Sequence, residues 1–280
     1  MKIIRVFPKR TNGTPDDDLV RINCQPGLFD QADEIHISAT FTADIPIVEK
    51  LEKAWRHIAQ TKIGGPAFDD PGEEFEPGKY LKKGYVITSR GCPNKCWFCF
   101  VPKREGEIRE LEIKDGFNIL DNNLLACSKD HIKKVFLMLK RQGKRPVFSG
   151  GLEARKLKPW IAEELINLNP DQLFFAFDMP SALEGLEQVS FLLKKAFPIS
   201  SRVLRCFVLC GYKGDSPEAA ELRIEKIIKL GFLPFAMIYK DGKNIPDQRW
   251  ARWSRTWIRP CRSIMESRKR GWIPERSGRP

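Results

Sequence analysis

The sequence predicts an α/β protein: a partial (β/α)6 barrel of parallel strands, preceded by a small βαβ unit and followed by a basic helix or tail. Between about residues 80 and 242, short apolar runs alternate with amphipathic stretches that suit helices of about 10–15 residues. Strands and helices that alternate in this way pair in parallel through right-handed crossovers. The 280 residues suffice for one large α/β domain with an appendage, and we expect divisions at 1–79, 80–248 and 249–280.

The first division contains one predicted βαβ unit. DEIHISAT at 33–40 has the composition of a strand, and IPIVEKLEKAWRHIAQ at 45–60 has the apolar spacing of an amphipathic helix. TKIGGPAF at 61–68 predicts a second strand that runs into a glycine pair. DDPGEEFEPGKY at 69–80 is rich in proline, glycine and acidic residues, and therefore predicts a connector.

Six strand–helix units follow in the second division. The predicted strands are 84–89, a strand within 110–126, 145–151, 171–178, 202–212 and 232–242. The predicted helices between them lie at 128–142, 158–168, 183–197 and 216–231. Ser128 suits the N-cap of the first of these helices. In such a fold a site is expected where the C-terminal ends of the strands meet the loops.

The composition is that of an ordinary globular protein, with 42% apolar and 30% charged residues. No run of about 18 apolar residues is present, so we expect no membrane span. The N-terminal MKIIRVFPKR lacks the apolar core of a secretory signal. These features predict a cytoplasmic protein whose thiols stay reduced, and eight cysteines are too few for a disulfide scaffold.

Three cysteines lie close together in TSRGCPNKCWFCF at 88–100, directly after a predicted strand. The thiolates of Cys92, Cys96 and Cys99 can hold three irons of a [4Fe–4S] cluster and leave the fourth iron open to another ligand. The lack of a fourth ligand nearby fits a catalytic metal centre, which keeps one coordination position open. We expect Trp97 and Phe98 to shield the cluster from solvent.

The alternative to an iron–sulfur cluster is a zinc site that includes one of the other cysteines. A structural zinc ion needs a fourth cysteine or histidine, and the remaining cysteines are distant in sequence, at positions 24, 127, 206, 210 and 261. With such a distant ligand, the chain would be a zinc- or Fe–S-stabilised nucleic-acid-binding protein that uses its basic C-terminal segment. Cys206 and Cys210 lie four apart on a predicted strand, and we expect them to be a buried, unreactive pair.

The spacing Cys92-x3-Cys96-x2-Cys99, with an aromatic residue before the last cysteine and a strand ahead of the loop, resembles the radical S-adenosylmethionine (radical SAM) superfamily. In that superfamily the open iron binds the amino and carboxylate groups of S-adenosylmethionine. The resemblance implies that one electron from the cluster cleaves S-adenosylmethionine to methionine and a 5′-deoxyadenosyl radical, which abstracts a hydrogen atom from a substrate. It also implies an electron donor such as a flavodoxin- or ferredoxin-like protein.

The resemblance implies a polar group near the ammonium of S-adenosylmethionine at the end of the second strand. Asp121, Asn122 and Asn123 stand at that place. The usual Gly-Gly-Glu form is absent there, and Asp-Asn-Asn is similar to the variant found in family members that carry a cobalamin-binding domain. The alternative is a turn in which these side chains cap the following helix.

Three further strand ends match places that the family uses for its cofactor. Glu153 follows Gly150 and Gly151 at the end of the third strand, one strand later than the usual Gly-Gly-Glu and with Leu152 inserted. The fourth strand ends in Asp178, where the family often contacts the ribose or methionine part of S-adenosylmethionine. The fifth runs into Gly211, which resembles a glycine-bearing segment near the adenine.

The N-terminal unit looks like a shortened version of the Rossmann-like domain that precedes the radical domain in cobalamin-dependent members. Those members often bind cobalamin through an Asp-x-His-x-x-Gly motif, and none of His36, His57 and His131 stands in one. Roughly 75 residues are also short for a complete doubly wound domain. We therefore do not predict cobalamin.

The C-terminal segment carries much of the net charge of +12, because ten Lys and Arg from position 249 onward face only two acidic residues. Trp250, Trp253 and Trp257 recur at helical spacing, and arginines surround them. We expect the tryptophan face to dock on the barrel while the arginines stay in solvent. Contact with the phosphates or bases of a nucleic acid is the alternative.

The sequence thus predicts a radical SAM enzyme whose substrate and reaction subclass are unknown. A variant of this hypothesis is that the enzyme modifies RNA or protein, by methylthiolation or methylation. Only the basic C-terminal segment supports it. No residue stands out as the catalytic hydrogen donor or acceptor.

Overall fold

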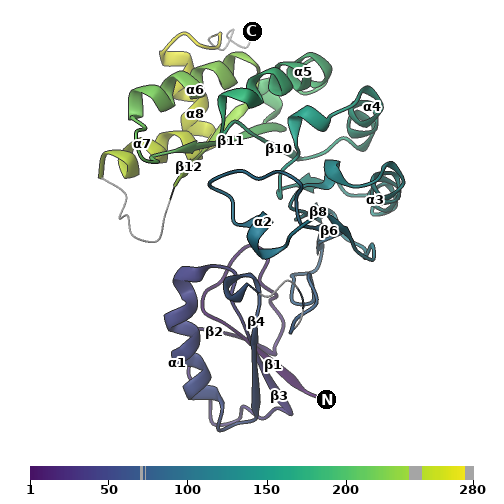
Figure 1. The fold of residues 1–280 in the computed structure, drawn as a ribbon, viewed down its shortest axis with the longest axis vertical. Coiled ribbons are helices and arrows are strands. Elements are labelled where there is room, and N and C mark those ends of the chain that lie inside the picture. The colour runs from purple at the N-terminus through teal and green to yellow at the C-terminus, as the bar shows by residue number, and fades with distance from the viewer. Residues whose placement is uncertain (70–71, 73, 240–247, 275–280) are drawn as a thin grey trace, which may run out of the picture. The chain divides into compact units, whose positions relative to one another are not determined.

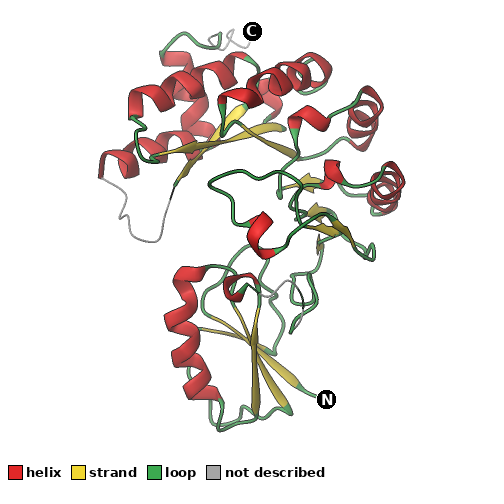
Figure 2. Cartoon of the chain, in the orientation of Figure 1, coloured by secondary structure: helices red, strands yellow, loops and turns green. Residues whose placement is uncertain are grey.

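A computed structural model describes residues 1–69, 72, 74–239 and 248–274, and the side chains of 248 and 249 lie outside the description. The chain divides into two compact units, Met1–Gly116 and Phe117–Pro280 (Figure 1). This boundary lies later in the chain than the predicted division at residue 79. Each unit has its own helices and strands (Figure 2).

The first unit contains a four-stranded parallel sheet in the order β2-β1-β3-β4. Its strands are β1 (Ile3–Phe7), β2 (Val20–Ile22), β3 (Glu34–Ser38) and β4 (Gln60–Gly64). The sequence predicted the last two, and the structure adds β1 and β2 before them. The predicted βαβ unit is therefore the second half of a larger sheet.

Helix α1 (Ile45–Trp55) packs its apolar face against this sheet. Alternate residues of β1 and β3 point to the helix, because successive side chains of a strand lie on opposite faces. The core between helix and sheet consists of Ile4, Val6, Ile35, Ile37, Val48, Leu51 and Trp55, together with Ala39 and Ala67. Short 3-10 turns at Thr42–Asp44 and Pro66–Phe68 flank the helix and β4.

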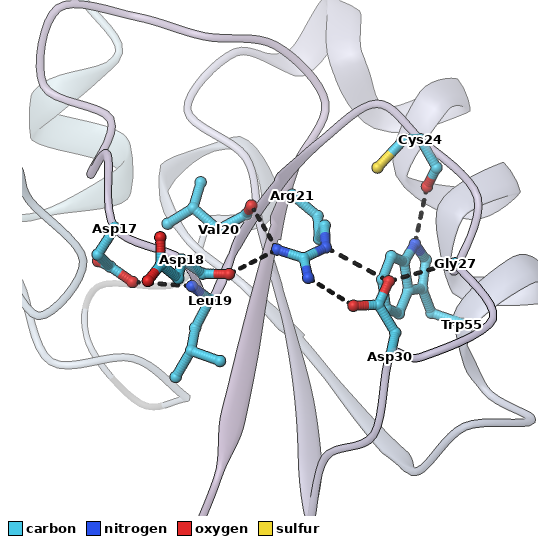
Figure 3. Close-up of polar contacts among 9 residues, drawn as sticks. All are labelled: Asp17, Asp18, Leu19, Val20, Arg21, Cys24, Gly27, Asp30 and Trp55. Carbon is cyan, nitrogen blue, oxygen red and sulfur yellow. Dashed lines mark hydrogen bonds and ion pairs between the residues drawn. The ribbon is translucent and has the colours of Figure 1, made fainter.

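The segment between β2 and β3 is fastened to the same unit at two points (Figure 3). The Arg21 guanidinium donates to both carboxylate oxygens of Asp30, at 3.3 and 2.5 Å. The indole N–H of Trp55 donates to the carbonyl oxygen of Cys24 at 2.9 Å, so the last residue of α1 also anchors this loop. Phe29 at the tip of the loop is 93% exposed.

Shorter elements complete the first unit. They are β5 (Tyr85–Val86), β6 (Ser89–Arg90), the helix α2 (Val101–Arg104) and β7 (Arg109–Glu110). Strands β6 and β7 pair antiparallel, with Ser89 opposite Glu110. The cysteine-bearing segment is therefore a loop between two paired strands.

The second sheet has six strands in the order β12-β11-β10-β9-β8-β5. In the second unit its strands are β8 (Asn118–Ile119), β9 (Val147–Phe148), β10 (Gln172–Ala176), β11 (Leu204–Cys210) and β12 (Leu233–Ile238), all pairing in parallel. From β8 to β12, neighbours in the sheet are neighbours in the sequence, as is usual for strands joined by helical crossovers. The α/β class with a parallel sheet is confirmed, and the finer description as a (β/α)6 barrel stays a prediction.

Four helices connect these strands: α3 (Lys129–Arg141), α4 (Pro159–Leu168), α5 (Leu183–Leu193) and α6 (Pro217–Lys229). Short 3-10 turns lie at Leu124–Ala126, Ala154–Lys156, Pro180–Ala182 and Ile199–Ser201. The first and last residues of all four helices lie within a few residues of the predicted ends. The N-cap prediction at Ser128 is confirmed, since its Oγ accepts a hydrogen bond from the N–H of His131 at 3.2 Å.

The basic segment folds into two helices, α7 (Gln248–Ile258) and α8 (Pro260–Lys269). Both helices pack on β12. Trp257 is 1% exposed and stacks on Trp272, with the ring centroids 5.6 Å apart. The prediction that the tryptophan face docks on the sheet is confirmed at Trp250 and Trp257, which are both buried.

Membrane-spanning helices are not found in the described part of the chain, where no helix combines the required length with enough apolar residues.

Truncation of Trp55 tests the core of the first unit. We expect Trp55→Ala to lower the free energy of unfolding by about 3–5 kcal/mol, because it removes a buried aromatic ring and leaves the Cys24 carbonyl without its donor. Phe29→Ala removes a similar ring from a solvent-exposed position and should change stability by less than about 0.5 kcal/mol. Urea unfolding of both variants, followed by circular dichroism, measures the difference, and equal losses would contradict this account of the core.

Candidate functional site

The cysteine loop belongs to the first unit and runs from the end of β6 to the start of β7. At its base, the N–H of Cys92 donates to the carbonyl oxygen of Gly106 at 3.1 Å. On the other side of the strand pair, the N–H of Leu111, which follows β7, donates to the carbonyl oxygen of Thr88, which precedes β6, at 2.9 Å. The base of the loop is therefore closed by backbone hydrogen bonds on both sides of the β6–β7 pair.

Gly91 lies at the tightest point of this base. Its φ of +87° is in the left-handed region, and a Cβ there would stand 2.0 Å from the carbonyl oxygen of Glu107. No side chain fits at that distance, so the close approach of the two ends of the loop requires glycine. The sequence contains this glycine directly before the first cysteine, where it marks the loop's entry.

Glu105 holds the returning end of the loop through two arginines. Its carboxylate lies 3.7 Å from Nε of Arg90 and 3.2 Å from a guanidinium nitrogen of Arg109. Arg109 also donates to the carbonyl oxygen of Glu105 at 2.9 Å. The acid is nearly buried between the two cations, which lie one on each paired strand. Sequence reasoning missed Glu105, although it stands in a run of alternating charges, KREGEIRE.

Helix α2 follows the last cysteine and is tied to the rest of the first unit. Arg104, at the end of this helix, forms an ion pair with Asp69 at 2.7 Å. Its guanidinium also lies 4.9 Å from the centre of the Phe100 ring. These contacts fix the exit of the loop, as the Gly91 contact fixes its entry.

The structure places the three predicted ligands on this one loop. Cys92, Cys96 and Cys99 are all half-buried, and the N–H of Cys99 donates to the carbonyl oxygen of Cys96 at 3.1 Å, which closes a turn between them. Three thiols on a short loop are the donor type that an iron–sulfur cluster requires. Within the residues described, however, no group of three or more His, Cys, Asp or Glu side chains is gathered closely enough to hold a metal ion. The donors fit the cluster in kind, and their present arrangement does not.

The two aromatic residues between the last two cysteines contact each other. Trp97, which was expected with Phe98 to shield a bound cluster, has a side chain that is 59% exposed. It meets Phe98 edge to face, with the ring centroids 5.4 Å apart. Trp97 lies between the two fixed ends of the loop, and its shielding of a bound cluster stays a prediction.

In the second unit, the polar residues after β8 meet those after β9. Asp121 and Asn123 are buried, and Asn122 between them is half-buried. The Asn123 amide donates to a carboxylate oxygen of Glu153 at 2.8 Å. The other carboxylate oxygen of Glu153 accepts from Arg155 at 3.1 Å. The structure therefore brings together two of the predicted cofactor-binding positions, Asn123 and Glu153.

Gly150 permits the close contact between these two strand ends. A Cβ on Gly150 would lie 2.1 Å from the carbonyl oxygen of Asp121. The backbone of the third predicted strand end therefore passes directly beside Asp121, and only glycine leaves room for it. Of the glycine pair at 150–151, Gly150 is therefore the residue that lets the two strand ends pack together.

Asp178 lies after β10 and contacts the neighbouring strand. Its carboxylate accepts a hydrogen bond from the N–H of Leu209 at 3.0 Å. Burial raises the pKa of Asp178 to about 6, against the opposing effects of this hydrogen bond and of the Arg223 guanidinium. The carboxylate therefore links the segment after β10 to the backbone of β11.

A buried ion pair, which was not predicted from the sequence, lies beside Gly211. The guanidinium of Arg223 donates to the carbonyl oxygen of Leu209 at 3.1 Å and to a carboxylate oxygen of Asp215 at 2.7 Å. The same oxygen of Asp215 accepts from the N–H of Gly211 at 2.9 Å. The side chain of Asp215 is 1% exposed, so one arginine and one aspartate fix the loop after β11 from inside the protein.

Gly211 itself is covered by the protein. On the side where a Cβ would point, the Trp250 ring and the Ile238 side chain lie 3.4 Å away. The glycine therefore allows helix α7 to approach the end of β11. Its predicted role near the adenine stays a prediction, because this contact concerns only one side of the residue.

The cysteines of β11 agree with the prediction of a buried pair. Cys206 and Cys210 are both fully buried, and their thiols point toward the carbonyl oxygens of Phe207 and Met237, at 3.5 and 3.4 Å. Burial raises the pKa of Cys210 to about 12 and that of Cys206 well above its ordinary value. Both thiols therefore stay protonated and unreactive at neutral pH.

Comparison with known families and proteins adds nothing to this geometry. No protein-family model matches the chain, and no curated protein matches its sequence. The functional argument therefore depends on the residues themselves.

The base of the cysteine loop can be tested at its glycines. We expect Gly91→Ala to destabilise the first unit by at least about 3 kcal/mol, because the new methyl group meets the Glu107 carbonyl and the backbone is strained as well. Gly106 also has a positive φ but no atom within 4 Å of a new Cβ, so Gly106→Ala should cost only about 1 kcal/mol. Thermal unfolding and limited proteolysis of the loop compare the two, and similar behaviour would show that the entry is not tightly packed.

The protonation of Asp178 predicts a pH dependence of stability. Its pKa is higher in the folded protein, about 6, than in the unfolded chain, so the native state holds the proton more tightly. We expect the free energy of unfolding to fall by about 3 kcal/mol as the pH rises from about 4 to above 6, with the loss complete above the folded pKa. Asp178→Asn retains an acceptor for the Leu209 N–H and should lose this fall. Urea unfolding across the pH range measures the difference between the two proteins, and parallel curves would contradict the assignment.

Proposed function

We propose that the chain is a radical SAM enzyme in which Cys92, Cys96 and Cys99 hold a [4Fe–4S] cluster. The observation that carries the proposal is the placement of three thiols on one short loop whose two ends are fixed by Gly91, Glu105 and α2. A loop fixed at its base and exposed at its outer part suits a metal centre that must admit a small molecule. When bound, the cluster would reduce S-adenosylmethionine and supply a 5′-deoxyadenosyl radical for hydrogen abstraction.

The proposal requires the loop to draw the three thiols together when a cluster binds. Metal sites often form only on binding, because the ligands are seldom preassembled without the metal. The short turn from Cys96 to Cys99 already brings two of the three ligands near each other along the backbone. The Cys92 backbone is held at the base, so most of the adjustment falls on residues 93–99.

The polar strand ends of the second unit would orient S-adenosylmethionine. Asn123 is oriented by its amide hydrogen bond to Glu153, and Asp121 is buried beside Gly150. Buried oxygens held in place in this way can accept hydrogen bonds from an ammonium group without losing side-chain entropy on binding. Asp178 and the Gly211 loop would line the neighbouring strand ends, with Asp178 present in both protonation states near pH 6.

The finer fold that accompanies this function is a (β/α)6 partial barrel, supported by the order of the six-stranded sheet and the sequential helix connections. The reaction would take its electron from a flavodoxin- or ferredoxin-like donor. Cobalamin has no place in the proposal. His36, which lies within β3, is buried and hydrogen-bonded to Glu34 at 2.7 Å and to the Tyr80 hydroxyl.

Anaerobic reconstitution with iron and sulfide tests the proposal. We expect the reduced protein to show the low-temperature EPR signal of a [4Fe–4S]⁺ cluster, and we expect S-adenosylmethionine to change that signal. Cys96→Ala should abolish it, whereas Cys261→Ala, which removes an exposed cysteine of α8, should leave it intact.

Two further results separate this function from its alternatives. Reconstitution should protect the loop at 91–106 from proteolysis, because the cluster fixes its outer part. A protein that instead binds one zinc ion, forms no cluster and does not respond to S-adenosylmethionine would overturn the proposal.

A further inference from the structure

Helix α7 has two faces of opposite character. At 100° per residue, Arg252 and Arg255 of α7 lie about 60° apart, on the side opposite the tryptophans, and Arg259 follows directly after the helix. Trp250 and Trp257 are buried against the sheet, whereas all three arginines are exposed. The tryptophans fasten the helix, and the arginines are left to face solvent.

Arg262 continues this exposed set on the first turn of α8. We call Arg252, Arg255, Arg259 and Arg262 the arginine face. None of their four guanidinium groups forms an ion pair or a hydrogen bond within the part of the chain that the structure describes. Arg270 of the same segment is different, because it pairs with Glu221 at 2.8 Å and with Glu266 at 2.7 Å.

The composition of the segment favours phosphate as the partner of the arginine face. From position 249 onward there are nine arginines and one lysine, although the whole chain contains more lysines than arginines. A guanidinium binds a phosphate through two parallel hydrogen bonds, whereas a lysine offers a single compact charge. Such a strong preference for arginine is unexpected for a face whose only role is solubility.

The packing of α7 argues against a membrane surface. Helices that bind a bilayer insert an apolar face between the lipids and keep their cations at the headgroups. The apolar face of α7 is already covered, since Trp257 is almost fully buried and Trp250 packs on Gly211. The arginine face can therefore meet phosphates only from the outside, as a cationic surface on a folded support.

We propose that the arginine face binds the sugar–phosphate backbone of a nucleic acid. The proposal goes beyond the enzymatic function above and does not depend on it. Arg252 and Arg255 are three residues apart on α7, so they are separated by a rise of about 4.5 Å along the helix. A nucleic-acid strand carries one phosphate per about 3.4 Å of duplex axis, so neighbouring arginines can reach successive or alternate phosphates.

Binding of a labelled 20-nucleotide single-stranded RNA, and of duplex DNA of the same sequence, tests this proposal on the full chain without reconstituted iron. We expect dissociation constants of about 1–100 μM near physiological salt, and affinity that falls linearly with the logarithm of salt concentration. Arg252→Glu combined with Arg255→Glu should weaken binding by about tenfold or more. Arg252→Gln with Arg255→Gln should lower the magnitude of the salt slope by about 1.4–1.8.

The matched control is Lys133→Glu combined with Lys134→Glu on α3, which makes the same change of charge at two exposed lysines. This variant should bind the nucleic acids almost as the unmodified chain does. Circular dichroism checks that all variants are folded, and the glutamine pair keeps the test valid if the charge reversal unfolds α7.

Three results would overturn the proposal. They are equal weakening by the lysine and arginine variants, binding to vesicles that contain an acidic phospholipid but not to either nucleic acid, and binding to an acidic protein alone. Cys96→Ala should retain nucleic-acid binding. A failure of the proposed cluster function can therefore be distinguished from a failure of the proposed nucleic-acid binding.

Discussion

Parallel pairing of neighbouring strands is the constraint on which the second unit depends. Because β8, β9, β10 and β11 lie side by side in one direction, the residues that follow each strand emerge at the same edge. Two contacts at this edge join neighbours: Asn123 reaches Glu153 across β8 and β9, and Asp178 reaches Leu209 across β10 and β11. Each of these two side chains is therefore held by the adjacent strand or by the segment that follows it.

The sequence predicted those parts of the fold that local patterns determine. The helices α3 to α6 follow from apolar periodicity, and Ser128 caps α3 because a hydroxyl before a helix can accept from its first N–H groups. Strands β1 and β2 were missed because they are five and three residues long, and the segment that joins them contains no helix. Alternation of strands and helices, the main signal used, is absent there.

The residues missed at the candidate site depend on tertiary packing. Arg223 meets Asp215 and Leu209 only because α6 lies against β11, and neither spacing nor composition reveals that contact. Glu105 likewise depends on the antiparallel pairing of β6 with β7. Cysteine spacing, by contrast, specifies the order of the ligands along the chain and their chemistry. Whether the thiols converge depends on what binds them, so spacing predicts a cluster site better than it predicts the positions of its ligands.

The C-terminal helices are held by their own interior contacts. Trp257 stacks on Trp272, and Arg270 lies over both rings while it pairs with Glu221. A segment that is already ordered does not lose backbone entropy when a partner binds, unlike a basic tail that folds on contact. A polyanion should therefore meet a rigid surface, and its association should show little of the large negative heat-capacity change that accompanies coupled folding.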